Sequence, residues 1–436
     1  MRIMYGPLEG KIALPPSKSV VHRLLICSAL ADGCSEISGV ALSDDIKATI
    51  EGLRALGCRI TDMSGSGGGC ECPSKSLDLK VEPDRMRISG GPISVNCRES
   101  GSTLRFLLPV AAALSKNAVF TGEGRLPQRP LSEYLRLLPQ HGVKIEGEGL
   151  PLTISGRLTS GEYTIFGNVS SQYITGLLMA LPLLEGDSQI RLLSPLESSA
   201  YVDITLAVLK EFSVEVLKNA DGFFVPGGQK YRPVRLCTEG DWSQAAFFME
   251  AAALGGNVTI TGLSENSAQG DRAGAEVFKS LGADIKFSGK DLLCRRGAQG
   301  RGITVDVSEI PDLAPAIAAA AAMAEGDTVI TGGKRLRLKE SDRISSTVNA
   351  LRSMGFDAEE REDGLLVHGT GGMAPRLKAA VVDSAGDHRI AMAFSVLAAY
   401  MPFETVIKGH ECVKKSYPDF YEDFKKIGGK FDVDNR

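Results

Sequence analysis

The sequence lacks a hydrophobic run long enough to cross a membrane. The longest, Leu313–Ala324, holds about twelve residues and is rich in alanine, whereas a spanning helix needs about 20. The N-terminal stretch MRIMYGPLEGKIALPPSK has no continuous apolar segment, so we expect no secretory signal. An excess of positive charge is also absent, because 49 Lys and Arg stand against 53 Asp and Glu, a formal net charge of −4. We therefore expect neither nucleic acid nor a membrane as a partner.

Motifs for nucleotides and metals are missing as well. Gly332-Gly333-Lys334 has neither the upstream glycine nor the following Ser or Thr of a P-loop, and the glycine run at 65–69 does not fit the dinucleotide fingerprint. The five histidines show no HxxH or HExxH spacing. We expect no metal and no cofactor.

Cysteines are too scattered for a disulfide framework. There are nine, an odd number, which favours reduced thiols and predicts a cytoplasmic protein. The one close pair, Cys70-x-Cys72, lies in the Gly- and Ser-rich insertion Ser64–Ser76, for which we expect a surface loop.

A six-fold internal repeat is present. Each unit reads as an apolar helix, a short strand ending in Gly, a polar loop and a second helix closed by a turn. The second helices end at intervals of about 70 to 85 residues, at Gly57, Gly142, Phe212, Gly282, Gly355 and Gly428. Helical and strand periods alternate within each unit, which predicts an α/β protein. The first helices, such as Ala246–Leu254 and Ala314–Met323, are apolar on all faces and should be buried with the strands outside, the inverse of a usual barrel.

Polar residues gather where the first helices begin. The clusters are Ser17-Lys18-Ser19, Glu99–Ser102, Ser170-Ser171-Gln172, Asp241-Trp242-Ser243, Pro311-Asp312 and Asp387-His388-Arg389. Ser and Asp there suit helix capping, but capping does not require Lys18, Gln172, His388 or Arg389. If the buried helices run parallel, their N-termini share one face, and their dipoles favour anions.

The loops before the second helices add a second polar layer. It contains Arg125, Arg129, Ser198, Tyr201, the segment Lys339–Arg343 and Lys414-Lys415. Arg105 lies inside an apolar helix, so it must be paired or bind a ligand. So many cations in a net-negative chain predict a pocket for a polyanionic small molecule carrying phosphate and carboxylate. The acid–base candidates there are Asp312, Glu340, Lys18 and His388.

Six segments resemble the EPSP synthase (3-phosphoshikimate 1-carboxyvinyltransferase) family of enolpyruvyl transferases, in order along the whole chain. They are Pro16–Arg23 (PSKSVVHR), Glu99–Arg105 (ESGSTLR), Ser170–Tyr173 (SSQY), Lys339–Arg343 (KESDR), Gly386–Met392 (GDHRIAM) and Lys415–Asp419 (KSYPD). Glu99, Phe106 and Arg335 depart from the family's pattern, which commonly has Asn, Pro and a polar neutral residue there.

The resemblance implies transfer of the carboxyvinyl group of phosphoenolpyruvate to the 5-hydroxyl of shikimate 3-phosphate, with release of phosphate, in the shikimate pathway. It also implies a two-domain inverted α/β barrel of six βαβαββ-type units with buried parallel helices, whose domains close on substrate. The domains would be residues 1–16 with 238–436, and residues 17–237.

Site residues follow from the same resemblance, by matched position. Asp312 would be the base on the 5-hydroxyl, and Glu340, with Lys18, would protonate the methylene carbon. The residues expected to bind shikimate 3-phosphate are Lys18, Ser19, Arg23, Ser170, Ser171, Gln172, Ser198, Tyr201, Asp312 and Lys339. Those expected to bind phosphoenolpyruvate are Lys18, Gly101, Arg129, Gln172, Arg343, Arg389 and Lys415.

Two other functions remain open at this point. One is the sister activity that transfers enolpyruvyl to UDP-N-acetylglucosamine, although that family has Lys-Asn where this chain has Lys18-Ser19, and a cysteine-bearing loop where this chain has Arg125–Arg129. The other is a non-catalytic anion-binding relative, although Asp312, Glu340 and Lys18 are all present. Nothing in the sequence demands an oligomer, so we expect a monomer.

Overall fold

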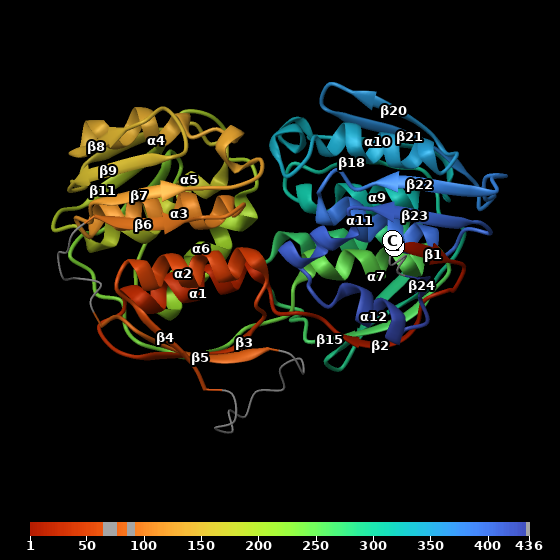
Figure 1. Ribbon diagram of the computed structural model, residues 1–436, viewed down its shortest axis with the longest axis horizontal. Coiled ribbons are helices and arrows are strands. Elements are labelled where there is room, and N and C mark those ends of the chain that lie inside the picture. The colour runs from red at the N-terminus through yellow and green to blue at the C-terminus, as the bar shows by residue number, and fades with distance from the viewer. Residues whose placement is uncertain (64–75, 85–91, 433–436) are drawn as a thin grey trace. The chain divides into compact units, whose positions relative to one another are not determined.

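The computed structural model describes residues 1–63, 76–84 and 92–432 (Figure 1). The loop expected at Ser64–Ser76, with Cys70 and Cys72, lies outside the described residues except for Ser76. Six described cysteines carry free thiols, namely Cys27, Cys34, Cys58, Cys97, Cys294 and Cys412. Cys237 is disulfide-bonded, so the expectation of reduced thiols is wrong for that residue.

The chain forms two compact units. The terminal unit consists of Met1–Pro15 with Gly240–Arg436, and the central unit is Pro16–Glu239. The chain therefore passes from one unit to the other twice, within two residues of the predicted crossings. That these units act as domains that close on substrate stays a prediction.

The first helix of every repeat is buried within its unit, as its all-round apolar sequence predicts. Ten residues of α1, from Val21 to Leu30, are buried, and α3 is buried over nearly its whole length. These helices are α1 (Lys18–Leu30), α3 (Gly101–Ala113) and α5 (Ser171–Ala180) in the central unit, and α7 (Trp242–Ala253), α9 (Ala314–Ala321) and α11 (His388–Ala398) in the terminal unit. In Figure 1, α7, α9 and α11 pack side by side inside the terminal unit.

Three four-stranded sheets enclose the helices of the central unit, in the orders β14-β3-β5-β4, β6-β7-β9-β8 and β10-β11-β13-β12. In each sheet the first two strands are parallel and the remaining neighbours antiparallel. The strands are β3 (Ser35–Val40), β4 (Arg59–Asp62), β5 (Leu77–Glu82), β6 (Ile93–Asn96), β7 (Ala118–Thr121), β8 (Val143–Glu146), β9 (Leu152–Gly156), β10 (Glu162–Ile165), β11 (Ser188–Leu192), β12 (Leu217–Asn219), β13 (Gly222–Val225) and β14 (Arg235–Cys237).

Three more sheets enclose the terminal unit, in the orders β16-β17-β15-β2, β18-β19-β21-β20 and β22-β23-β1-β24. The N-terminal strands complete two of them, because β2 pairs in parallel with β15 while β1 lies antiparallel between β23 and β24. The strands are β1 (Arg2–Met4), β2 (Glu9–Ala13), β15 (Asn257–Thr261), β16 (Ala283–Ser288), β17 (Asp291–Arg296), β18 (Thr304–Asp306), β19 (Glu325–Thr331), β20 (Asp357–Arg361), β21 (Gly364–Thr370), β22 (Ala379–Asp383), β23 (Glu404–Lys408) and β24 (Lys430–Asp432).

The second helices end in a left-handed residue, as the repeated glycines predict. Gly57, Gly282 and Gly355 have φ of 107°, 109° and 83°, a conformation that costs glycine little. The third repeat is an exception, because the left-handed position is Ser213 (φ 59°) and not Phe212. The helices are α2 (Asp44–Ala55), α4 (Ser132–Leu137), α6 (Ser199–Glu211), α8 (Gly274–Ser280), α10 (Arg343–Ser353) and α12 (Phe420–Lys426).

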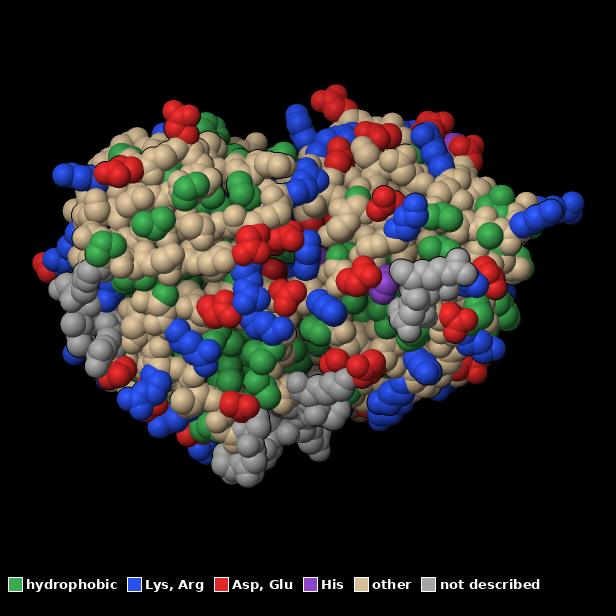
Figure 2. Space-filling view, viewed as in Figure 1, with side chains coloured by type: hydrophobic (Ala, Val, Ile, Leu, Met, Phe, Trp, Pro, Cys, Tyr) green, Lys and Arg blue, Asp and Glu red, His purple; other side chains and the backbone are tan. Residues whose placement is uncertain are grey.

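Short 3-10 turns occur throughout and carry several polar residues. They are η1 (Leu126–Gln128), η2 (Leu138–His141), η3 (Leu181–Leu183), η4 (Gly270–Ala273), η5 (Pro311–Leu313), η6 (Lys334–Leu338) and η7 (His410–Lys415). None of the helices in the described ranges is both long and apolar enough to cross a membrane. On the face seen in Figure 2, Lys and Arg side chains are interspersed with those of Asp and Glu.

Candidate active site

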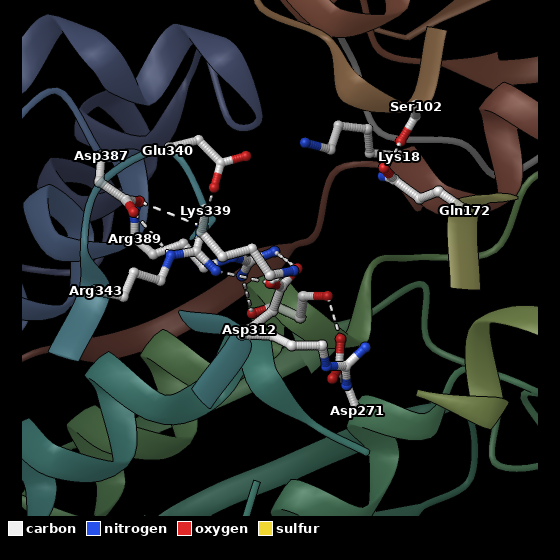
Figure 3. A network of polar contacts seen from close by, with 12 residues as sticks. Lys18, Ser102, Gln172, Asp271, Asp312, Lys339, Glu340, Arg343, Asp387 and Arg389 are labelled. Carbon is white, nitrogen blue, oxygen red and sulfur yellow. Dashed lines mark hydrogen bonds and ion pairs between the residues drawn. The ribbon is translucent and has the colours of Figure 1, made fainter. Parts of the chain in front are cut away.

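Asp312 is the centre of a charged network in the terminal unit (Figure 3). Its Oδ1 accepts a hydrogen bond from Arg343 Nη1 at 2.8 Å, and its Oδ2 accepts one from Arg389 Nη2 at 2.8 Å. Lys339 Nζ lies 3.5 Å from Oδ1. One carboxylate is therefore contacted by three cations, and charge-assisted bonds of this kind are the strong ones.

These side chains lie at the starts of helices. Asp312 is in η5, directly before α9, where Pro311 suits the first helical turn. Arg343 is the first residue of α10, and Arg389 is the second residue of α11. The hydrogen bonds above therefore join the starts of three helices, two of them the buried first helices α9 and α11 and the third the second helix α10.

Asp387 caps α11 and also holds Arg343. Its Oδ1 accepts from the backbone N–H of Arg389 at 3.0 Å, which is the capping role that the sequence predicts. Its Oδ2 accepts from Arg343 Nε at 2.7 Å and from Ser341 Oγ at 3.1 Å. Glu340 contributes a third carboxylate, 2.6 Å from Arg343 Nη2. Arg343 is thus bound by three carboxylates.

Burial and the neighbouring charges have opposite effects on the pKa values of the side chains in this network. Burial disfavours the charge of Arg343, but the surrounding carboxylates, led by Asp387, outweigh it and raise the pKa of the guanidinium well above its usual value. Burial alone would raise the pKa of Asp387, yet Arg343 lowers it below the usual value. Burial lowers the pKa of Lys339, against the opposing effect of Asp312. The carboxylate–guanidinium core is therefore ionised, and Lys339 gives up its proton more readily than a free lysine.

Lys415 reaches the same helix start from η7. Its Nζ donates to the carbonyl oxygen of Gly386 at 3.0 Å, in the turn that precedes α11. The terminal unit thus brings together all six site residues that the sequence predicts within it, namely Asp312, Lys339, Glu340, Arg343, Arg389 and Lys415.

In the central unit, Gln172 joins the starts of α3 and α5. Its Oε1 accepts from Arg105 Nη1 at 2.9 Å, and its Nε2 donates to Ser102 Oγ at 3.0 Å. Because a guanidinium can only donate, Arg105 fixes the orientation of the amide. Arg105 also donates to the carbonyl of Pro130 at 2.8 Å and lies 5.2 Å from the centre of the Tyr173 ring. The prediction that Arg105 is paired or bound is therefore confirmed.

Gly101 leaves room for two arginines beside this amide. A Cβ built at Gly101 would lie 2.7 Å from Arg105 Nη1 and 2.8 Å from Arg129 Nη1, closer than real Cβ contacts. The missing side chain lets both guanidinium groups approach the start of α3. Ser100 caps that helix through the N–H of Thr103, and Ser170 caps α5 through the N–H of Gln172.

Lys18 and Arg23 extend from α1 in different directions. Lys18 Nζ pairs with Asp45 Oδ2, 2.8 Å away at the start of α2. Arg23 is 3% exposed, and it donates to the carbonyls of Ser19 at 2.6 Å and Tyr201 at 2.8 Å. Burial lowers its pKa to about 10. Arg23 thus supports the backbone at two of the residues expected to bind substrate.

The other predicted residues of the central unit lie at helix starts. Ser198 precedes α6 with a left-handed backbone (φ 53°) and is 3% exposed, and Ser171 is the first residue of α5. Ser17 precedes α1 but makes no side-chain cap, so the capping interpretation is wrong there. Phe106, one of the three departures from the family's pattern, is buried against His22 and against Arg23, whose guanidinium carbon lies 5.2 Å from the centre of the Phe106 ring.

Several polar partners in these networks were not predicted from the sequence. Asp45 follows Ser43-Asp44 in what reads as an ordinary acidic first turn of a helix. Ser102, Ser243 and Asp387 appear only as residues of helix-start clusters, and Asp271 belongs to none of these clusters. The part of the chain that the structure describes contains no group of three or more His, Cys, Asp or Glu side chains that could hold a metal ion.

Comparison with known proteins decides the family. The model of the EPSP synthase (3-phosphoshikimate 1-carboxyvinyltransferase) family matches residues 4–424. The chain belongs to the EPSP synthase family. A 3-phosphoshikimate 1-carboxyvinyltransferase of Clostridium kluyveri is 43% identical over 98% of this chain and 96% of that protein. The protein of the same name from Clostridium novyi is 41% identical over 99% and 98%.

Solved structures agree with this family and with the fold. The EPSP synthase of Acinetobacter baumannii superposes with a TM-score of 0.78 at 28% identity, over 98% of each chain. The enolpyruvyl transferase NikO from Streptomyces tendae has the same TM-score at 16% identity, over 98% of this chain and 97% of that one, which supports the fold alone. The predicted fold class, an inverted α/β barrel of repeated units, is confirmed.

Proposed function

We propose that this member of the EPSP synthase family transfers the carboxyvinyl group of phosphoenolpyruvate to the 5-hydroxyl of shikimate 3-phosphate. The products are 5-enolpyruvylshikimate 3-phosphate and phosphate. The observation that carries the proposal is Asp312, held by Arg343, Arg389 and Lys339. Removing the proton of the alcohol requires a base, which the carboxylate supplies. Holding two anionic substrates beside that base requires the cations. Whole-length relatives with this activity in their names support the same reaction.

Proton transfers are assigned mainly to the terminal unit, with Lys18 of the central unit assisting one of them. Asp312 takes the proton of the 5-hydroxyl as its oxygen bonds to the second carbon of phosphoenolpyruvate. Glu340, with Lys18, delivers a proton to the methylene carbon, which becomes the methyl group of a tetrahedral intermediate. Glu340 then takes a proton back from that methyl group as the carbon–oxygen bond to phosphate breaks, so the carbon–carbon double bond is restored, the product is an enol ether and phosphate is released. The reaction so written needs no cofactor.

Anion binding is assigned to both units. Phosphoenolpyruvate and shikimate 3-phosphate together bring about five or six negative charges, which repel by several kcal/mol at close range unless cations surround them. We assign phosphoenolpyruvate to Lys18, Gly101, Arg129, Gln172, Arg343, Arg389 and Lys415. We assign shikimate 3-phosphate to Lys18, Ser19, Arg23, Ser170, Ser171, Gln172, Ser198, Tyr201, Asp312 and Lys339.

The ion pairs found without substrate fit this assignment. Lys18 pairs with Asp45, and Arg389 with Asp312, so each cation has an internal partner that an incoming anion can replace. Keeping buried charges paired avoids the cost of an isolated ion. We also propose that the protein acts on these small molecules as a monomer in the cytoplasm.

The test is release of phosphate from phosphoenolpyruvate by the purified protein, with and without shikimate 3-phosphate. Release that depends on shikimate 3-phosphate is the expected result. Release that instead depends on UDP-N-acetylglucosamine would assign the sister activity, which the family match does not favour. No release with either acceptor would leave a non-catalytic anion-binding protein. Sedimentation of the same sample tests the monomer.

A further inference from the structure

Asp271 is a buried carboxyl group that the proposed reaction does not use. It lies in η4, the turn that precedes α8, and is 4% exposed. Its Oδ2 accepts a hydrogen bond from the hydroxyl of Ser243, the second residue of α7. A buried carboxyl group is costly to maintain unless it is paired or protonated.

Ser243 connects this carboxyl group to the base. Its hydroxyl bonds Asp271, while its backbone carbonyl accepts from Arg389 Nη1 at 3.3 Å. Arg389 Nη2 in turn donates to Asp312 Oδ2 at 2.8 Å. Asp271 and Asp312 are therefore connected through Ser243 and Arg389, with the hydroxyl and the backbone carbonyl of Ser243 making separate hydrogen bonds, and Figure 3 shows both carboxyl groups in the same network. Ser243 and Arg389 are themselves buried, and electrostatic effects are strong in such surroundings.

The surroundings of Asp271 leave it poised between its two charge states. Burial, and then the charge of Asp312, raise the pKa of Asp271 to about 7, while Ser243 and Arg389 act in the opposite direction. Asp241, the cap of α7, adds a smaller upward effect. On α8, Glu276 pairs with Lys279 at the surface, 2.7 Å away. Asp271 thus changes charge near neutral pH.

We propose that Asp271 is a positioning residue that sets the strength of Asp312 as a base. Three cations around one carboxylate stabilise its charged form and so weaken it as a base. Repulsion between two carboxylates is mutual, so an ionised Asp271 makes Asp312 hold a proton more strongly. It also draws on Arg389 through Ser243 and offsets one of the three cations. This inference rests on the proposed function.

The pH dependence of turnover distinguishes this role from a structural one. Because ionised Asp271 strengthens the base, kcat of the wild-type protein should rise with pH through the pKa of about 7. Asp271→Asn keeps the shape and still accepts from Ser243, but it carries no charge. We expect little change at about pH 6 and a loss of about three- to tenfold at about pH 8, since general-base rates follow base strength. Affinity for shikimate 3-phosphate, measured by calorimetry, should not change.

A second variant keeps the test decisive if Asp271→Asn does not fold. Ser243→Ala leaves the carboxylate but removes the hydrogen bond that favours its ionised form, so the inflection in the kcat profile should move to higher pH. Asp291→Asn is the matched control, because Asp291 is a surface carboxylate of the same unit that pairs with Lys11 at 2.7 Å. Its profile should follow the wild type.

Each outcome decides the inference. Loss of the pH step in Asp271→Asn, or its upward shift in Ser243→Ala, supports the role. An equal loss at every pH, no loss, or an unmoved inflection in Ser243→Ala overturns it while the proposed function stands. If the wild-type protein releases no phosphate with shikimate 3-phosphate, the proposed function fails first, and the inference fails with it. The carbon-13 resonances of labelled aspartates report the ionisation of Asp271 near pH 7 without turnover. They therefore separate a failure of the proposed function from a wrong account of the Asp271 charge.

Discussion

Buried arginines have different partners in the two units. In the central unit, Arg23 and Arg105 donate to neutral oxygens, from backbone carbonyls, a threonine hydroxyl and the Gln172 amide. In the terminal unit, Arg343 and Arg389 donate to carboxylates. The pKa of Arg23 falls to about 10 through burial, whereas that of Arg343 rises well above its usual value.

The partners of a buried arginine decide how much of its positive charge is left to act on a ligand. Arginines held by neutral groups keep an uncancelled positive charge, which attracts anionic substrates. Arginines held by carboxylates keep acid–base groups ionised and fixed in place. We propose that the buried arginines of the central unit serve mainly to attract anions and those of the terminal unit mainly to hold acid–base groups in place, and the predictions below test this contrast in order of decreasing effect.

Asp312→Ala should break the terminal network at its centre. We expect kcat to fall on the order of a thousandfold, within the range that general bases contribute, because the 5-hydroxyl loses its base. Binding of shikimate 3-phosphate, measured by calorimetry, should stay within roughly tenfold, about 1.4 kcal/mol. Unchanged turnover would refute the base role. Asp312→Asn, which preserves the volume, is the control for changes in packing.

Asp387→Asn should unfold the protein at lower denaturant than the wild type. Removing one partner of a buried ion pair costs about 3–5 kcal/mol, here because Arg343 loses its fully buried carboxylate partner. Asp342→Asn is the matched control, since Asp342 also caps a helix, α10, but is partly exposed. We expect a loss of at most about 1 kcal/mol there, because Asn still caps the helix and a partly exposed ion pair contributes little. Equal losses for the two variants in urea titrations would contradict the account.

At low pH, Asp387 should lose its contribution to the free energy of unfolding. The pKa of Asp387 is lower in the folded protein than in the unfolded chain, so its stabilising effect is fully present above the unfolded value of about 3.9. It is lost as the pH falls through the lower, folded pKa. The stability difference between wild type and Asp387→Asn should therefore narrow towards low pH. A difference that stays constant from neutral to acid pH would show that the pair does not act through charge.

Lys415→Ala should affect one substrate more than the other. Lys415 bonds the turn before α11, and loss of a bond to a charged group costs about 1.5–3 kcal/mol, so KM for phosphoenolpyruvate should rise about tenfold or more. The affinity for shikimate 3-phosphate should change little. If steady-state kinetics and calorimetry show the reverse, the assignment of Lys415 to phosphoenolpyruvate is wrong.

Ser102→Ala should have the smallest effect and no pH dependence. It removes one neutral hydrogen bond to Gln172, worth about 0.5–1.5 kcal/mol, so kcat/KM should fall a few-fold by the same factor at every pH. Arg105 still orients the amide in this variant. A pH-dependent loss would show that the central network carries titrating charge, against the contrast drawn here.

Local patterns predict much of this fold. Helices that are apolar on every face, such as α9, are buried, and the glycines after α2, α8 and α10 take the left-handed conformation. The third repeat has no glycine at this position. Aligning the six repeats with one another places the turn one residue early, at Phe212 instead of Ser213. A serine in that conformation leaves no strong signal in a sequence.

Partners across the fold are harder to predict. Asp45, Ser243 and Asp271 look like ordinary helix-start residues, and their roles come from contacts with Lys18 and Arg389, which lie 27 and more residues away. The pairing of β1 with β23 and β24 joins opposite ends of the chain, which no local period encodes. The resemblance to the family supplied the site residues, but not these partners.

The most direct test of the account is phosphorus-31 NMR of a mixture of protein, phosphoenolpyruvate and shikimate 3-phosphate. The account predicts that phosphoenolpyruvate is lost only when shikimate 3-phosphate is present, with free phosphate and 5-enolpyruvylshikimate 3-phosphate appearing in equal amounts. Phosphoenolpyruvate that persists beside shikimate 3-phosphate, or that is lost equally without it, would contradict the account.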